Sequence, residues 1–134
     1  MNEYPTCGLW PARNRIAASV LDGAGRLCRI WLGPQNECEE WDCLYELERE
    51  FGLALRLVVP EGMSHTEGIA KIALQREMPV TVAPTRLVEA IGLVAYSRLT
   101  PRQCATVLAR LPDSRFRSHL RLLPRQDPRQ LLLL

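Results

Sequence analysis

Apolar and polar positions alternate with two different periods along this chain, and the period predicts where strands give way to helices. Residues 15–21 and 26–32 are apolar stretches of strand length, separated by Asp22-Gly23-Ala24-Gly25. Because glycine tolerates positive φ and aspartate favours turns, these stretches predict a β-hairpin. Residues 1–12 contain two prolines and show no period, so they predict an irregular lead-in.

Helical spacing begins after the hairpin. Asn36 is suited to cap a helix, with Glu39 in the capping-box position three residues on, and Gly52 is suited to end it. The apolar residues of this segment fall at helical spacing: Trp41, Leu44, Leu47 and Phe51.

A strand–helix–strand unit is predicted next. Residues 53–59 form an apolar run typical of a buried parallel strand, and residues 60–63 predict a loop. Ser64 with Glu67 predicts a second capping box, before an apolar stripe that continues to Met78. Pro79 ends that helix and residues 80–82 form a short strand, which together predict a right-handed βαβ unit.

Two further helices are predicted after this unit. Thr85 is suited to cap the first, and Thr100 with Gln103 forms a capping box for the second, which runs to about Leu111. The buried side of the first is predicted to carry Leu87, Val88, Ile91, Val94 and Ala95. Residues 113–123 fit either a helix capped by Asp113 or a strand with its arginines outward, and we favour the helix.

Composition places the chain among ordinary globular domains. Its 134 residues are 47% hydrophobic and 24% charged, which predicts one domain over residues 1–134 with a core at about 15–111 and an arginine-rich extension at 112–134. No apolar run approaches the roughly 18–20 residues of a membrane helix, and no secretory signal is visible, so we expect a cytoplasmic location and no membrane partner. The five cysteines include no Cys-x-x-Cys pair, which predicts reduced thiols, no zinc site and no cofactor.

Charge is unevenly distributed. Residues 36–52 carry seven acids against Arg49, a formal charge of −6, whereas residues 98–134 carry eight arginines against two aspartates, a formal charge of +6. Four leucines end the chain at 131–134, and we expect them to pack on the domain or on a partner.

Three segments resemble the N-terminal, RuvC-like domain of DEDD-class insertion-sequence transposases. They are Val58-Val59-Pro60-Glu61-Gly62-Met63-Ser64-His65, residues 78–86, and Thr100-Pro101-Arg102-Gln103-Cys104-Ala105. The resemblance covers about residues 15–111. It implies an α/β fold of ribonuclease-H-like type, in which a β-hairpin precedes alternating helices and parallel strands and extra helices follow at the C-terminus. Compared with that fold, the predicted order of elements lacks one early strand.

The departures from that family concern its carboxylates. The family places an Asp in its first strand, where the resemblance puts Ala17, Ala18 and Ser19, and its two later Asp residues fall on Pro101 and Cys104. Only Glu61 lands on a carboxylate position. Two-metal phosphoryl chemistry needs several carboxylates around two divalent ions. We therefore expect that this chain has no nuclease activity and is not an enzyme.

Two groups of residues remain as candidate sites. Glu61, Ser64 and His65 surround the end of a parallel strand, where open α/β sheets bind ligands, although a solvated loop is the commoner role. Arg115, Arg117 and Arg121 are candidates for phosphate contacts. We therefore expect a non-catalytic, nucleic-acid-associated accessory protein. The alternatives are a structural protein acting through homodimerisation or a protein partner, and an enzyme with a site at Glu61 and His65.

Overall fold

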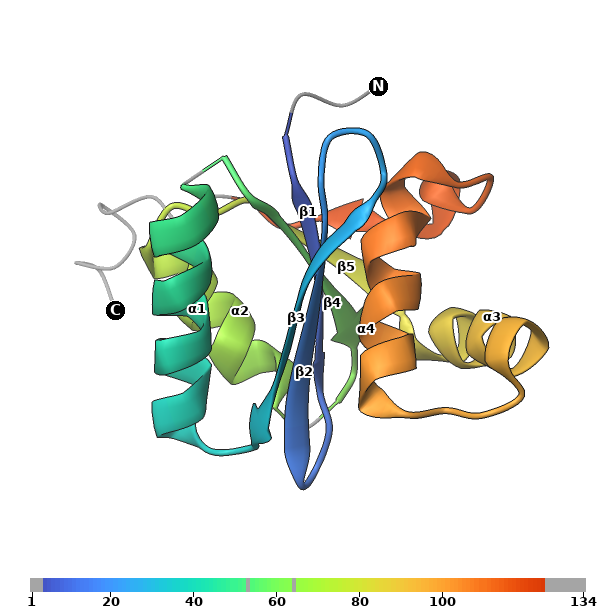
Figure 1. The fold of residues 1–134 in the computed structure, drawn as a ribbon, viewed down its shortest axis with the longest axis horizontal. Coiled ribbons are helices and arrows are strands. Elements are labelled where there is room, and N and C mark those ends of the chain that lie inside the picture. The colour runs from blue at the N-terminus through green and yellow to red at the C-terminus, as the bar shows by residue number, and fades with distance from the viewer. Residues whose placement is uncertain (1–3, 53, 64, 125–134) are drawn as a thin grey trace.

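The computed structural model describes residues 4–52, 54–63 and 65–124, and a mixed sheet forms its centre (Figure 1). The strands run in the order β3-β2-β1-β4-β5-β6. Pairing is antiparallel for β1–β2, β2–β3 and β5–β6, and parallel for β1–β4 and β4–β5. The strands are β1 (Thr6–Pro11), β2 (Arg15–Leu21), β3 (Leu27–Pro34), β4 (Arg56–Glu61), β5 (Val80–Pro84) and β6 (Arg121–Leu122).

The predicted irregular lead-in is wrong, because β1 lies at the centre of the sheet. Cys7 and Leu9 pack into the apolar cluster on one face, and Trp10 packs into the cluster on the other. A strand that is buried on both faces shows no alternation of apolar and polar residues, so its period is invisible in the sequence. The early strand that the resemblance seemed to lack is therefore present.

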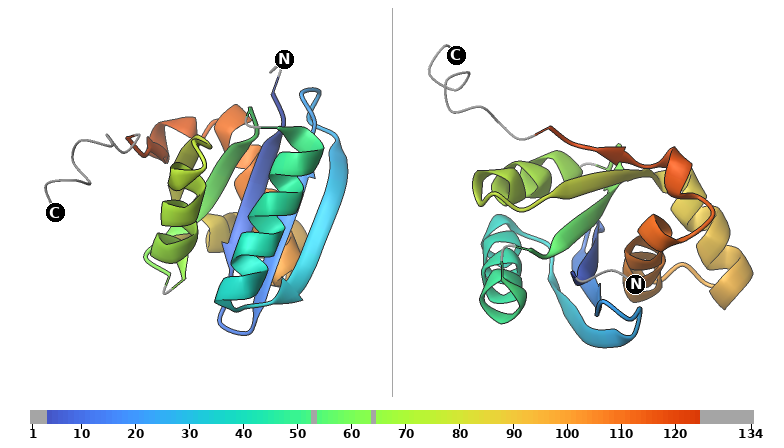
Figure 2. Two further views of the ribbon diagram at one scale, coloured as in Figure 1. Left: turned by 90° about the vertical axis from the view of Figure 1, so that its left-hand side faces the viewer. Right: turned by 90° about the horizontal axis from the view of Figure 1, so that it is seen from above.

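Helices cover both faces of the sheet (Figure 2). The helices α1 (Glu37–Phe51) and α2 (Thr66–Gln75) pack on one face, and α3 (Thr85–Tyr96) and α4 (Pro101–Arg110) on the other. In the part of the chain that the structure describes, no helix is long and apolar enough to cross a membrane.

Local signals place several of these elements correctly. The Asn36 side chain accepts from the Glu39 amide, and Thr100 and Gln103 form the predicted capping box. Asp22 closes the hairpin turn by accepting from the amides of Ala24 and Arg26.

Other boundaries differ from the prediction. The third predicted strand begins at Arg56 and continues through Glu61. The helix α2 has His65 as its N-cap without a side-chain cap bond, and the predicted cap at Ser64 lies outside the described residues. Pro84, not Thr85, precedes the first turn of α3, and the Thr85 hydroxyl donates to the Glu61 carbonyl instead.

The C-terminal third also differs from the prediction. Val94 is 89% exposed, because the buried residues of α3 are Val88 and Gly92. Residues 113–123 form neither one helix nor one strand: two short 3-10 turns, η1 (Leu111–Asp113) and η2 (Arg117–His119), precede β6. The leucines at 131–134 lie outside the described residues.

Candidate functional site

An apolar cluster occupies the carboxyl end of β1. Trp10, next to last in β1, is 8% exposed and belongs to one cluster with Val58, Ala83 and Cys104. The partly buried Met63, from the loop after β4, packs against this cluster. Strand ends of this kind are where open α/β sheets commonly place polar ligand-binding groups, and here apolar side chains fill the space.

The helix α4 closes over this cluster from above the sheet. Its approach is close because Gly8 has no side chain, and a Cβ atom there would lie 1.9 Å from the Ala105 carbonyl oxygen. The buried Ser19 hydroxyl on β2 lies 2.8 Å from the Thr106 hydroxyl on α4. Burial between α4 and the sheet raises the pKa of the Cys104 thiol to about 11, so the thiol is protonated at neutral pH.

No carboxylate of β1 or of the first turn of α4 faces this region. The resemblance puts the family's first-strand Asp at Ala17, Ala18 and Ser19, but these residues lie on β2. The first strand of the fold is β1, whose residues Thr-Cys-Gly-Leu-Trp-Pro include no acid. Within residues 4–52, 54–63 and 65–124, no three His, Cys, Asp or Glu side chains are grouped so that they could hold a metal ion.

Glu61 points away from Trp10. Leu57 and Val59 belong to the cluster on the α1 and α2 face, so the alternation of β4 sends the Glu61 side chain to that face as well. There its Oε1 lies 3.2 Å from the guanidinium of Arg121 on β6. Glu61 is therefore bound to an arginine on the opposite face of the sheet from Trp10 and Cys104.

His65 has a different neighbour from Glu61. The largest effect on the pKa of the buried Glu40 carboxyl is burial, which raises it, while a hydrogen bond from Gln35 and the nearby charge of His65 oppose the rise. The residues of the predicted ligand loop therefore do not form one site. Glu61 pairs with Arg121 and His65 lies near Glu40, while Ser64 is outside the described residues.

The three arginines predicted to contact phosphates have different surroundings as well. Arg121 is paired with Glu61, whereas the guanidinium of Arg115 lies 4.9 Å from the ring centroid of Phe116. Arg117 is exposed and borders a hollow of about 700 Å³, together with Tyr4 and Arg56.

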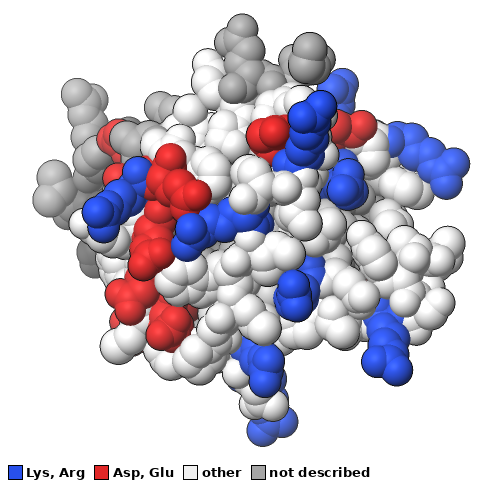
Figure 3. All heavy atoms as spheres, in the orientation of Figure 1, with Lys and Arg blue, Asp and Glu red and all other residues white. Residues whose placement is uncertain are grey.

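The acidic helix α1 has partners other than these arginines. Arg29 on β3 binds Glu46 and Glu50, and Arg76 after α2 binds Glu48. Figure 3 shows the acidic side chains gathered over α1 and mainly basic ones over α3 and α4. The basic C-terminal third therefore does not neutralise α1 in the described part of the chain.

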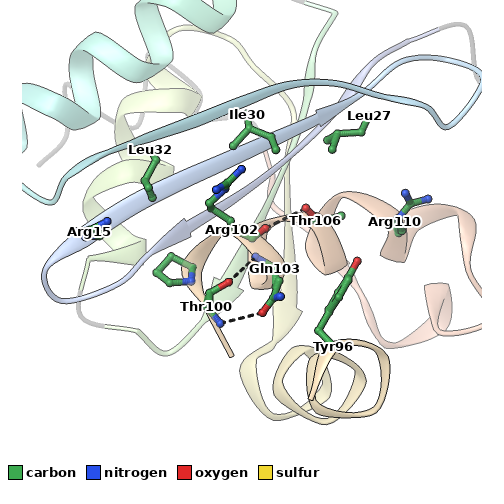
Figure 4. Close-up of a pocket in the computed structure, with 11 residues that line it drawn as sticks. Arg15, Leu27, Ile30, Leu32, Tyr96, Thr100, Arg102, Gln103, Thr106 and Arg110 are labelled. Carbon is green, nitrogen blue, oxygen red and sulfur yellow. Dashed lines mark hydrogen bonds between the residues drawn. The ribbon is translucent and has the colours of Figure 1, made fainter. Parts of the chain in front are cut away.

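A groove that the sequence did not predict runs between β3 and α4 (Figure 4). It encloses about 760 Å³, and its lining includes aliphatic residues of β3 and arginines of β2 and α4. On the side of the sheet the lining includes Leu27, Ile30 and Leu32 of β3, with Arg15 of β2. On the side of the helices it includes Arg102 and Arg110 of α4 and Tyr96 of α3. The sequence could have indicated one side of the groove through the spacing of Arg102 and Arg110 on one helix. That β3 lies opposite these arginines follows only from the fold.

Comparison with known proteins identifies the fold. The structure is similar to that of Thermus thermophilus RuvC, with a TM-score of 0.59 and 13% identity over 78% of this chain and 90% of that one. It is also similar to T. thermophilus RuvC in complex with a Holliday junction substrate, with a TM-score of 0.53 and 14% identity over 79% of this chain and 90% of that one. No protein-family model and no curated protein matches the sequence. This likeness confirms the ribonuclease-H-like fold expected from the sequence, whereas the closer resemblance to transposases stays a prediction.

Proposed function

We propose that this chain is a non-catalytic RuvC-like module that binds nucleic acid. The observation that carries the first half is the apolar cluster around Trp10 and Cys104 at the carboxyl end of β1. Nuclease chemistry with two divalent ions needs several anionic oxygen ligands in one place, and a tryptophan beside a protonated thiol supplies none. The remaining carboxylate, Glu61, is engaged by Arg121.

Support for nucleic-acid binding comes from the surface after α4. Arg115 and Arg117 are exposed there, and the adjacent hollow combines Arg117 with the half-exposed ring of Tyr4. Arg56 also lines this hollow, but it lies 3.9 Å from the Asp113 carboxylate. Guanidinium groups beside an aromatic face suit a nucleic-acid strand, because the arginines can contact phosphates while a base stacks on the ring. The RuvC structure that holds a Holliday junction makes a junction the first ligand to test.

The binding test uses labelled single-stranded, duplex and four-way-junction DNA, measured by fluorescence anisotropy across a salt series. We expect binding that weakens steeply with salt and that Arg115→Ala with Arg117→Ala reduces about tenfold or more. Arg121→Ala is the matched control, because that guanidinium is already paired, and it should change affinity little. No binding to any of the three DNAs at low salt would overturn the nucleic-acid half of the proposal.

The catalytic half is tested separately with the same junction in Mg²⁺ or Mn²⁺. We expect intact strands after prolonged incubation. Metal-dependent cleavage that co-purifies with the folded chain, and that Glu61→Gln abolishes, would show that the chain is an enzyme after all.

The second candidate is an interaction protein that acts through homodimerisation or a protein partner. The observation in its favour is the separation of acidic α1 from the basic side chains over α3 and α4 (Figure 3). Sedimentation velocity over a concentration series distinguishes it, because self-association through opposite charges would weaken as salt increases.

A further inference from the structure

The groove between β3 and α4 has one aliphatic wall. Leu27, Ile30 and Leu32 are 45%, 38% and 42% exposed, although they lie on a strand of the central sheet. They remain exposed because β3 is an edge strand and α4 packs on β1 and β2 rather than on β3. Exposed aliphatic side chains in a row mark a surface whose apolar area a partner can remove from water, which favours association.

The other residues of the groove give it a positive charge. Arg102 and Arg110 are two turns apart on one side of α4, so they are separated by about 12 Å along the helix, and Arg15 continues the row on β2 (Figure 4). Among the residues that the structure describes, no acid lines the groove and none forms an ion pair with any of the three arginines.

We propose that this groove docks a segment of another protein that carries aliphatic side chains along one side and Asp or Glu along the other. The aliphatic residues would cover the β3 wall and the carboxylates would meet the arginine row, so that both halves of the groove are satisfied by one ligand. A nucleic-acid strand would place phosphates against the arginines and a base against Tyr96, but it would leave the aliphatic wall of Leu27, Ile30 and Leu32 uncovered.

A second copy of the chain fits the groove less well. The acidic surface of the chain is α1, but Glu46, Glu48 and Glu50 are already paired with Arg29 and Arg76. A copy that used these three glutamates would have to break those ion pairs. The exposed Glu37 and Asp42 of α1 are accompanied by the exposed aromatic rings of Trp41 and Tyr45 rather than by a row of aliphatic side chains. A separate acidic segment can bring free carboxylates and aliphatic side chains together. The proposal is independent of nucleic-acid binding, which we place at Arg115 and Arg117.

The test is selection of a random 16-residue peptide display library on the full chain. We expect the enriched peptides to combine Leu or Ile with Asp or Glu, and the double variant Arg102→Glu, Arg110→Glu to bind them about tenfold or more weakly by anisotropy. Arg86→Glu, an exposed arginine of α3 outside the groove, is the matched control and should bind as the wild-type chain does. Methyl NMR of the wild-type chain with a selected peptide should shift the signals of Leu27, Ile30 and Leu32, which tests the site without any substitution.

Three outcomes would overturn the proposal. The first is enrichment of basic peptides, or of none. The second is that an oligo-dT strand displaces the peptide, that the Arg102→Glu, Arg110→Glu variant no longer binds this strand, and that the Arg115→Ala, Arg117→Ala variant still does. The third is concentration-dependent self-association that the double variant abolishes, which would assign the groove to a second copy.

Discussion

The backbone of Gly8 on β1 lies directly against the backbone of Ala105 on α4. A Cβ atom on Gly8 would come within 1.9 Å of the Ala105 carbonyl oxygen and 2.5 Å of the Ala109 amide nitrogen. Both are main-chain atoms of one helix, so neither can move aside without moving the helix. The distance between α4 and the centre of the sheet is therefore set by the absence of one side chain.

Gly8→Ala should accordingly cost more than about 3 kcal/mol of unfolding free energy, because overpacking here displaces a helix rather than a flexible side chain. Urea unfolding followed by circular dichroism measures the change. Gly68→Ala is the matched control: its new Cβ meets only Glu40 Oε2 at 3.8 Å, and alanine favours helix, so stability should rise by about 0.5–1 kcal/mol. Equal effects of the two substitutions would contradict the close packing of α4 on β1.

Trp10 fills the space at the carboxyl end of β1, so Trp10→Ala should leave a cavity there. We expect a loss of about 3–5 kcal/mol of unfolding free energy. Trp41 on α1 is 39% exposed, and Trp41→Ala should cost far less in the same urea titration. A loss below about 1 kcal/mol for Trp10→Ala would mean that this region is loosely packed and open to solvent.

The five cysteines should react with Ellman's reagent in two groups at pH 8. Cys28 and Cys38 are exposed, whereas burial raises the pKa of Cys43 to about 12 and of Cys104 to about 11, and raises that of Cys7 well above its usual value. Partial burial also raises the pKa of Cys28, so Cys38 should react first. Mass spectrometry of the labelled peptides identifies the order, and fast labelling of Cys7 in the native state would contradict the central position of β1.

Glu40 should make stability depend on pH in the direction opposite to an ordinary ion pair. Burial is the main cause that raises the pKa of this carboxyl in the folded chain, so the folded state holds its proton more tightly than the unfolded state does. The stabilising contribution is therefore fully present below the ordinary pKa of about 4.5 and is lost as pH rises through the folded-state value.

Glu40→Gln should consequently be more stable than the wild-type chain at pH 7 and close to it at pH 4, measured by urea unfolding at both values. The Gln35 side chain donates to Glu40, and an amide oxygen at position 40 can accept in the same place. A variant that is less stable than wild type at pH 7 would show that the ionised carboxylate, and its proximity to His65, stabilises the fold.

Local chemistry made part of this structure predictable. The Asp22 turn and the caps at Asn36 and Thr100 depend on residues within four positions of one another, so the sequence alone reveals them. That Pro101 and Cys104 are not acids is read directly from the sequence, but their correspondence to the aspartates of the transposase family stays a prediction.

The remaining features depend on contacts between distant residues. The strand β1 was missed because both of its faces are buried, and Val94 was misplaced because helical spacing does not show how much of α3 the sheet covers. Glu61 and Arg121 are sixty positions apart in sequence, so their pairing follows only from β6 joining the sheet beside β5. The groove likewise needs β3 and α4 side by side.

The central position of β1 also determines how late in synthesis the domain can become complete. This strand is synthesised before the other strands of the sheet, but its parallel partner β4 begins at Arg56 and the helix that covers Gly8 and Trp10 begins at Pro101. A nascent chain therefore holds its middle strand with one face uncovered until most of this domain has been made. Premature stop codons before α4 should yield fragments that chaperones retain and proteases degrade, rather than a smaller working domain.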